Sequence, residues 1–146
     1  VFDGLTDVRN FGGIARSAEC AGAHGLITPL KNSAPVNGDA IRSSAGALNN
    51  IPVCRVGSIR NTLKTLQVEG FQIVAATEKS KKLLYDADFT KPTVIVMGAE
   101  DKGISKEVLK LCDEQLAIPL IGHTESLNVA AAAAIMLFEV VRQRIG

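Results

Sequence analysis

The stretch of residues 118–130, with the sequence IPLIGHTESLNVA, decides the fold of this chain. Three apolar residues and a proline come first, a short polar loop follows, and a long apolar stretch begins after Ser126. A serine at the start of a helix accepts hydrogen bonds from backbone N–H groups that lack helical partners, so Ser126 predicts a helix start. The amide of Asn128, at the mouth of that helix, needs a partner of its own. A strand end, a loop and a helix start therefore converge here, and α/β proteins bind ligands at such places.

The rest of the chain alternates short apolar runs with helical patterns. We expect strands at 24–29, 52–56, 71–77, 92–97 and 115–120. We expect helices at 11–22 with Asn10 as N-cap, at 39–48, from Ser58 to about Gly70, from Ser105 to about Cys112, and at 126–144. The strands are continuously apolar, which is typical of a parallel sheet covered by helices on both faces. The fold class is therefore α/β.

The length and composition of the chain limit which class of protein it can be. It has 146 residues, of which 47% are hydrophobic, so we expect a single domain over 1–146. Its net charge of +1 neither favours nor excludes a nucleic-acid partner. The most apolar stretch, 127–141, is shorter than the ~20 residues that a membrane span needs, so we expect no membrane association. Because the chain begins at Val1 without a methionine, we expect a fragment that lacks an upstream RNA-binding domain.

Cysteines and histidines do not form a metal-binding pattern. Cys20, Cys54 and Cys112 lie far apart without a C-x-x-C motif, so we expect reduced, mostly buried thiols in a cytoplasmic protein. His24 and His123 are distant from each other and lack the i, i+4 spacing of a metal site, so we expect no metal.

Common cofactor and nucleophile motifs do not occur in this sequence. It contains no G-x-G-x-x-G, no P-loop and no G-x-S-x-G. A nicotinamide-dependent dehydrogenase is therefore disfavoured, and Ser126 is not predicted to be a hydrolase nucleophile.

Three short motifs lie in a fixed order along the chain. They are Asn10-x-Gly12-x-x-x-Arg16, then Gly98-x-Glu100-x-x-Gly103, then Ile118-Pro119 followed by Ser126-Leu127-Asn128-Val129. Together they resemble the motifs of the SpoU (TrmH) family of RNA 2′-O-ribose methyltransferases, in the SPOUT superfamily. The resemblance covers nearly the whole chain. It is strongest to the catalytic domain of 23S ribosomal RNA guanosine 2′-O-methyltransferases.

This resemblance implies a fold, a cofactor and an assembly. The fold would be an α/β domain with a deep C-terminal trefoil knot, working as a homodimer. S-adenosyl-L-methionine would bind inside the knot, and no metal would be needed because its methyl group is already activated. By motif, Gly98, Ile118 and Leu127 would line the cofactor site, and we expect Thr77, Met97 and Leu120 to join them at adjacent strand ends.

Arg16 is the catalytic candidate that the family motif implies. A guanidinium stays protonated in almost every protein site. Arg16 therefore either acts as a base in an unusual site assisted by RNA phosphate, or binds phosphate and stabilises the developing alkoxide while another group takes the proton. The simpler alternative is a surface ion pair with Glu19.

The other motif residues have both catalytic and structural interpretations. Asn10 would orient Arg16 or the ribose, or only cap a helix. Glu100 would pair with Arg16 across the dimer, or be a solvated loop carboxylate. Ser126 and Asn128 would position substrate and cofactor, or be a cap and a satisfied amide.

The expected substrate is structured RNA, most of all 23S ribosomal RNA. Transfer RNA remains an alternative, as does a catalytically inactive module that binds RNA or nucleosides. Candidates for phosphate contacts are Arg42, Arg60, Lys79 and Lys82.

Overall fold

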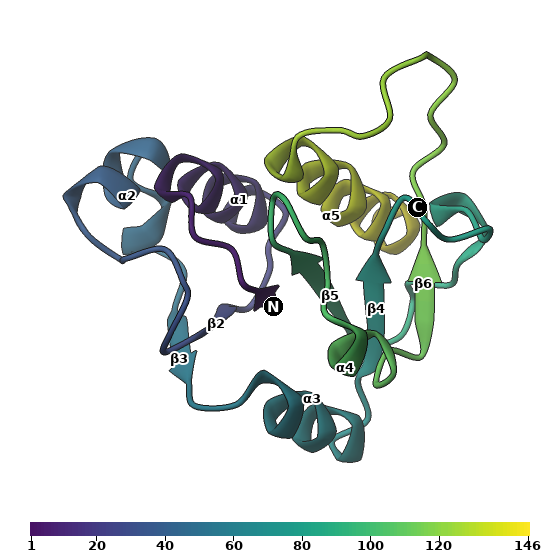
Figure 1. Ribbon diagram of the computed structural model, residues 1–146, viewed down its shortest axis with the longest axis horizontal. Helices are drawn as coiled ribbons and strands as arrows, with labels where there is room; N and C mark the ends of the chain where they lie inside the picture. Colours follow the sequence, from purple (N-terminus) through teal and green to yellow (C-terminus); the bar gives the residue numbers. More distant parts are fainter.

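The computed structural model describes all residues from Val1 to Gly146 as parallel sheets between helices (Figure 1). The elements in chain order are β1 (Phe2–Asp3), α1 (Val8–Cys20), β2 (Leu26–Pro29), α2 (Gly38–Ser43), the 3-10 turn η1 (Ala47–Asn49), β3 (Val53–Val56), α3 (Ile59–Val68), β4 (Gln72–Ala76), the 3-10 turn η2 (Leu84–Asp86), β5 (Thr93–Gly98), α4 (Lys106–Leu109), β6 (Glu114–Leu116) and α5 (Val129–Ile145).

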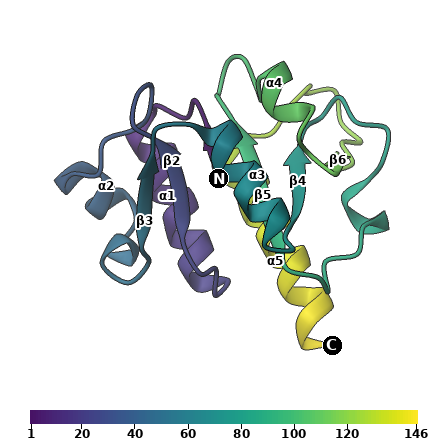
Figure 2. The ribbon, with the colours of Figure 1, turned by 90° about the horizontal axis from the view of Figure 1, so that it is seen from below.

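Every strand pairing is parallel, as the apolar runs predicted. One sheet has the order β1-β5-β4-β6, and β2 pairs with β3 in a second sheet. Figure 2 shows the β2–β3 pair standing apart from β4 and β5. Parallel strands need crossover connections, and here helices provide most of them.

Helices cover both faces of the sheets. Helices α1 and α5 pack together on one face, where Phe11, Ile14 and Ala133 join Met97 of β5 in a common core. On the other face, Leu63 of α3 and Val108 of α4 pack against β4 and β5. No helix of the structure is both long and apolar enough to cross a bilayer.

Several predicted boundaries were wrong. Helix α1 begins at Val8 with Asp7 as its N-cap, so Asn10 lies inside the first turn. Helix α5 begins at Val129, three residues after Ser126, and is capped by Asn128. The last strand ends at Leu116 rather than 120. The two helix errors have the same cause, because a polar residue near a boundary signals a cap without fixing which of several candidates is used.

The cysteines differ from the expectation in their burial. All three are free thiols, but Cys20 and Cys54 are exposed and only Cys112 is partly buried. Burial, with the nearby charge of Asp113, raises the pKa of the Cys112 thiol to about 11. No three His, Cys, Asp or Glu side chains lie close enough together to hold a metal ion.

Candidate functional site

A cavity of about 500 Å³ opens at the carboxyl ends of β4, β5 and β6. Its wall comes from residues 76–79, 97–104 and 126–129, together with Asn10, Leu109, Leu116, Ile118, Leu120 and Ala132. Half of the lining residues are hydrophobic, and the rest are polar or charged residues and two glycines, most of them in loops. Since ligands of open α/β sheets bind beyond the carboxyl ends of the strands, this cavity is the candidate site.

The loop after β5 forms one wall and folds tightly onto itself. The Ala99 N–H donates to the Gly103 carbonyl over 3.1 Å, and the Gly103 N–H donates back to the Ala99 carbonyl over 2.9 Å. A Cβ atom on Gly98 would lie only 2.3 Å from the carbonyl carbon of Gly103 and 2.4 Å from the nitrogen of Ile104. Gly98 is therefore required for the loop to close against the end of β5.

The start of α5 forms the opposite wall. Asn128 Oδ1 accepts hydrogen bonds from the N–H groups of Ala130 (2.8 Å) and Ala131 (3.2 Å), which caps the helix. Its Nδ2 donates to Asn10 Oδ1 over 3.0 Å, which joins the starts of α5 and α1. The expected hydrogen-bond partner of the Asn128 amide is thus Asn10, which lies 118 residues earlier in the chain.

The start of α1 links these groups to the loop after β5. Asp7 Oδ1 accepts from the Asn10 N–H over 2.8 Å, and the Asp7 N–H donates to Glu100 Oε1 over 3.2 Å. Through Asp7, Asn10 and Asn128, all three sequence motifs are joined at one edge of the sheet. Sequence reasoning missed Asp7, although an Asp just before a helix is itself a capping signal.

The cavity brings together ten of the eleven predicted site residues. The six expected at the cofactor site all line it, and so do four of the expected catalytic residues: Thr77, Met97, Gly98, Ile118, Leu120, Leu127, Asn10, Glu100, Ser126 and Asn128. Three other charged side chains in the wall were not predicted as site residues, namely Glu78, Asp101 and Lys102, whereas Lys79 was predicted as a phosphate contact.

Arg16 is the exception, because it does not line the cavity. It is exposed on α1 and forms no ion pair within its own chain, where Glu19 was the expected partner. The ion pair with Glu19 that the i, i+3 spacing suggested is therefore absent. Gly13, three residues before Arg16 on α1, lies against Ala130 of α5, with 3.4 Å between the Ala130 Cβ and a Cβ built on Gly13.

The sequence profile of the SpoU rRNA Methylase family matches residues 1–138. The chain belongs to the SpoU rRNA Methylase family. A relative named 23S rRNA (guanosine-2′-O-)-methyltransferase RlmB from Yersinia pestis is 41% identical over 144 residues, which are 99% of this chain and 58% of the relative. RlmB of Escherichia coli K12 is 40% identical, with 99% and 59% covered. The chain thus spans less than two thirds of the curated relatives that it matches.

Solved structures of SpoU methyltransferases have the same fold. AviRb from Streptomyces viridochromogenes, in complex with AdoMet, superposes with a TM-score of 0.91 at 38% identity and covers 99% of this chain and 59% of its own. The A. aeolicus TrmH/SpoU tRNA modifying enzyme has a TM-score of 0.89 at 31% identity, with 99% and 73% covered.

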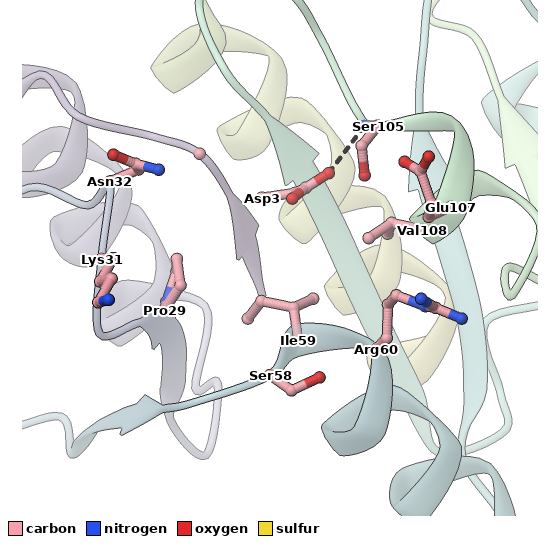
Figure 3. Close-up of a pocket in the computed structure, with 11 residues that line it drawn as sticks. Asp3, Pro29, Lys31, Asn32, Ser58, Ile59, Arg60, Ser105, Glu107 and Val108 are labelled. Carbon is pink, nitrogen blue, oxygen red and sulfur yellow. Dashed lines mark hydrogen bonds between the residues drawn. The ribbon is translucent and has the colours of Figure 1, made fainter.

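A second hollow, of about 360 Å³, contains none of the predicted cofactor or catalytic residues (Figure 3). Its wall mixes charges, with Lys31 on one side, Arg60 and Glu107 on the other, and the carboxylate of Asp3 between them. Asp3 Oδ2 accepts from the Ser105 N–H over 2.7 Å. Because this wall carries both positive and negative side chains and none of the three motifs contributes a cofactor or catalytic residue to it, the motif-lined cavity is the candidate site.

Proposed function

We propose that this protein methylates the 2′-oxygen of a ribose in structured RNA, with S-adenosyl-L-methionine as the methyl donor. The observation that carries the proposal is the meeting of all three motifs at one cavity, joined by the Asn10–Asn128 hydrogen bond. The names of the relatives, and the AdoMet complex of AviRb, support the same reaction.

The cavity fits such a donor by the chemistry of its lining. Met97, Ile118, Leu120 and Leu127 supply apolar walls for the adenine and the methionine chain of the donor, while the loops around Thr77 and Gly98 offer backbone donors and acceptors. When bound, the donor supplies a sulfonium methyl group that is already activated for transfer. The protein itself must hold the ribose hydroxyl in line and help to remove its proton.

Arg16 would complete the site from a second copy of the chain. It lies outside the cavity of its own chain, on the exposed side of α1. Helix α5, which packs beside α1, exposes the apolar side chains of Phe138 (47%) and Ile145 (81%). A homodimer that buries these side chains would bring a partner's α1 towards the site. There Arg16, protonated, would bind a phosphate and stabilise the developing alkoxide next to Glu100 and Ser126.

Replacing Arg16 tests this proposal. Arg16→Ala is expected to lower kcat for methyl transfer by roughly 100- to 1,000-fold, as loss of a single transition-state donor does. Arg9→Ala is the matched control, since Arg9 is also exposed on α1 and its loss removes the same charge. Equal kcat values for both variants and the parent, at saturating RNA, would contradict a catalytic role of Arg16.

The preferred substrate is 23S ribosomal RNA, after the names of the RlmB relatives. Transfer RNA is the second candidate, because the TrmH/SpoU neighbour from A. aeolicus is named as a tRNA modifying enzyme. Mapping of ribose methylation on both RNAs from a deletion strain, with and without the complementing protein, would distinguish them. Failure to bind S-adenosyl-L-methionine in calorimetry would instead indicate an inactive RNA-binding module.

Three further parts of the proposal concern the whole protein. A separate RNA-binding domain would precede this one, and the enzyme would act in the cytoplasm. Helix α5 would pass through the 77–92 segment to form the trefoil knot. The bridge between Leu83 and Ala117 and the bonds from Gln143 to the 87–89 backbone support such a passage. An experimental backbone that simplifies to an unknotted line would contradict the knot.

A further inference from the structure

The second hollow, of about 360 Å³, lies beyond the carboxyl ends of β1, β2 and β3. Asp3 is the last residue of β1, Pro29 is the last residue of β2, and Ser58 lies two residues after β3; all three line the hollow. Ligands of open α/β sheets bind beyond the carboxyl ends of the strands. The hollow therefore has the same kind of position as the motif-lined cavity, which lies beyond β4, β5 and β6.

One loop forms a common wall between the hollow and the motif-lined cavity. Residues 97–104 line the cavity, and the next residue, Ser105, lines the hollow. Asp3 of the hollow pairs in register with Gly98 of the cavity, and neighbouring strands lie about 4.8 Å apart. The Ser105 N–H donates to Asp3 Oδ2 over 2.7 Å, which holds the loop against the end of β1. The hollow is therefore within reach of a nucleotide that neighbours one held in the cavity.

The wall of the hollow carries two cations without a carboxylate partner. Lys31 lies on one side and Arg60 on the other (Figure 3). Both side chains are exposed, and neither forms an ion pair within the chain. By contrast, Arg42 and Lys82, two other candidates for phosphate contacts, are each paired with a carboxylate. Among these three candidates, only Arg60 is therefore free to bind an anion.

Two carboxylates in the same wall disfavour a simple anion site. Asp3 lies between the two cations, and Glu107 lies on the same side as Arg60 without forming an ion pair with it (Figure 3). A free phosphate would be repelled by both carboxylates. A nucleotide has matching groups, because its phosphate is an anion and a base such as cytosine carries an amino group from which a carboxylate accepts. The mixed wall therefore fits a nucleotide better than an inorganic anion.

The size of the hollow suits one nucleotide. Its volume of about 360 Å³ is near the lower end of the ~300–1,000 Å³ that small-ligand pockets have. Pro29, Ile59 and Val108 give the wall some apolar surface for one face of a base. Proteins recognise RNA sequence mainly in single strands and loops, where unstacked bases expose their edges. We therefore expect an unpaired nucleotide rather than a double helix.

We propose that the second hollow is a subsite for one unpaired nucleotide of the RNA substrate, next to the nucleotide whose ribose is methylated. Lys31 and Arg60 bind its phosphate. Asp3 and Glu107 accept hydrogen bonds from the amino group of a cytosine. The inference rests on the proposed function for the role of the RNA, but the hollow contacts neither the donor nor the reacting ribose. It therefore sets RNA affinity and base preference and leaves the chemical step unchanged.

Arg60→Ala tests the phosphate contact, with Lys64→Ala as the matched control. Lys64 lies one turn further along α3, is exposed and does not line the hollow. The probe is hexacytidylate, a single-stranded RNA, and its Kd is measured by fluorescence anisotropy at several salt concentrations. Only Arg60→Ala is expected to weaken binding, by about fivefold, and to reduce the slope of log Kd against log salt concentration by about 0.7, the value for one phosphate contact on a single strand. Failure of the parent to bind hexacytidylate, or equal losses in both variants, would overturn the proposal.

Glu107→Gln tests the base contact. Uracil has a carbonyl oxygen where cytosine has its amino group, so the parent should bind hexacytidylate about fivefold more tightly than hexauridylate. The amide of Gln both donates and accepts, so this preference should disappear in Glu107→Gln while the salt dependence stays as in the parent. Asp3 is less suitable for this test because its carboxylate also accepts from the Ser105 N–H. A parent without the preference, or a variant that keeps it, would show that the proposal is wrong.

Steady-state methyl transfer connects the hollow with the reaction. Arg60→Ala should raise KM for RNA about fivefold, with kcat at saturating RNA and the donor affinity from calorimetry equal to those of the parent. A parental KM for RNA in this variant would mean that the substrate does not use the hollow, and the proposal would fail. The hexacytidylate measurements need no donor. A parent that binds this probe as expected but transfers no methyl group would therefore contradict the proposed function and still support a nucleotide site in the hollow.

Discussion

The polar side chains at the two ends of α5 differ in their exposure and in their hydrogen-bond partners. At its first turn, Asn128 lies at an open cavity and shares hydrogen bonds with the helix and with Asn10, while Ser126 beside it is exposed. At its last turns, Glu139 is buried and its two oxygens accept from Arg142, both over 2.7 Å. The first end keeps polar groups available to a ligand, and the second uses them to hold the chain together.

The end of α5 around Glu139 and Gln143 is the closed end, where the polar side chains hydrogen-bond within the protein, and the end around Asn128 is the open end. Gln143 donates to Glu139 (2.8 Å) and to the Ala87 carbonyl (2.9 Å), and its Oε1 accepts from the Phe89 N–H (2.7 Å). Arg144 donates to the carbonyls of Phe89 and Lys91. No buried side-chain nitrogen or oxygen in the structure lacks a partner. The comparison teaches that changes at the open end should reduce function, while changes at the closed end should reduce stability.

The largest effect is expected from Gly98→Ala at the end of β5, in the cavity wall that α5 also lines, and it should reduce both stability and donor binding. The new methyl group would overlap the backbone of Gly103 and Ile104, so the loop must move, at a cost of about 3 kcal/mol and with loss of donor binding. Gly122→Ala is the control: no atom lies within 4 Å of its added Cβ, so its unfolding free energy should stay within about 0.5 kcal/mol of the parent. Urea unfolding and calorimetry measure both, and normal donor binding by Gly98→Ala would refute the account of the loop.

Asn128→Ser separates two roles of the Asn128 side chain, which caps α5 and donates a hydrogen bond to Asn10. A serine still caps the helix but is too short to reach Asn10, so stability should change by less than about 0.5 kcal/mol. Methyl transfer should fall roughly 100-fold, because the reacting groups lose their alignment. Asn128→Ala should in addition lose about 1 kcal/mol of stability. Equal activity of Asn128→Ser and the parent would remove the Asn10 link from the mechanism.

At the closed end, Glu139→Ala should show the reverse pattern. It removes the charged hydrogen bonds to Arg142 and the bond from Gln143, and should lower the free energy of unfolding by about 2 kcal/mol. The folded fraction should transfer methyl groups at the parental rate. If urea unfolding gave Glu139→Ala the same stability as the parent, the hydrogen bonds of Glu139 would not stabilise the fold.

The smallest effect concerns acidic pH. Hydrogen bonding to Arg142 lowers the pKa of Glu139 below its ordinary value of 4.5. The stability from this pair is therefore present above about pH 4.5 and is lost as the pH falls through the lower pKa of the folded state. Thermal unfolding at pH 7 and pH 3 should show a larger loss for the parent than for Glu139→Gln. An identical loss would rule out this pair as the acid-sensitive element.

Much of the fold followed from apolar patterning. The runs at 71–77 and 92–97 became the central strands β4 and β5, and both are parallel. The helix expected from Ser105 is only four residues long, and Ser105 forms no side-chain cap. Short helices depend on tertiary packing more than on local signals, so their lengths escaped prediction.

By itself the sequence determined the class of the fold, the family, and ten residues that the structure brings to one cavity, because periodicity and local motifs are written along the chain. Only the tertiary structure decided that Asp7 and Asn128 are the caps that join the motifs, that Gly98 is needed for a loop to close, and that Arg16 lies outside the cavity of its own chain. These are contacts between residues up to 118 positions apart, and no local pattern specifies which distant group will satisfy a polar side chain.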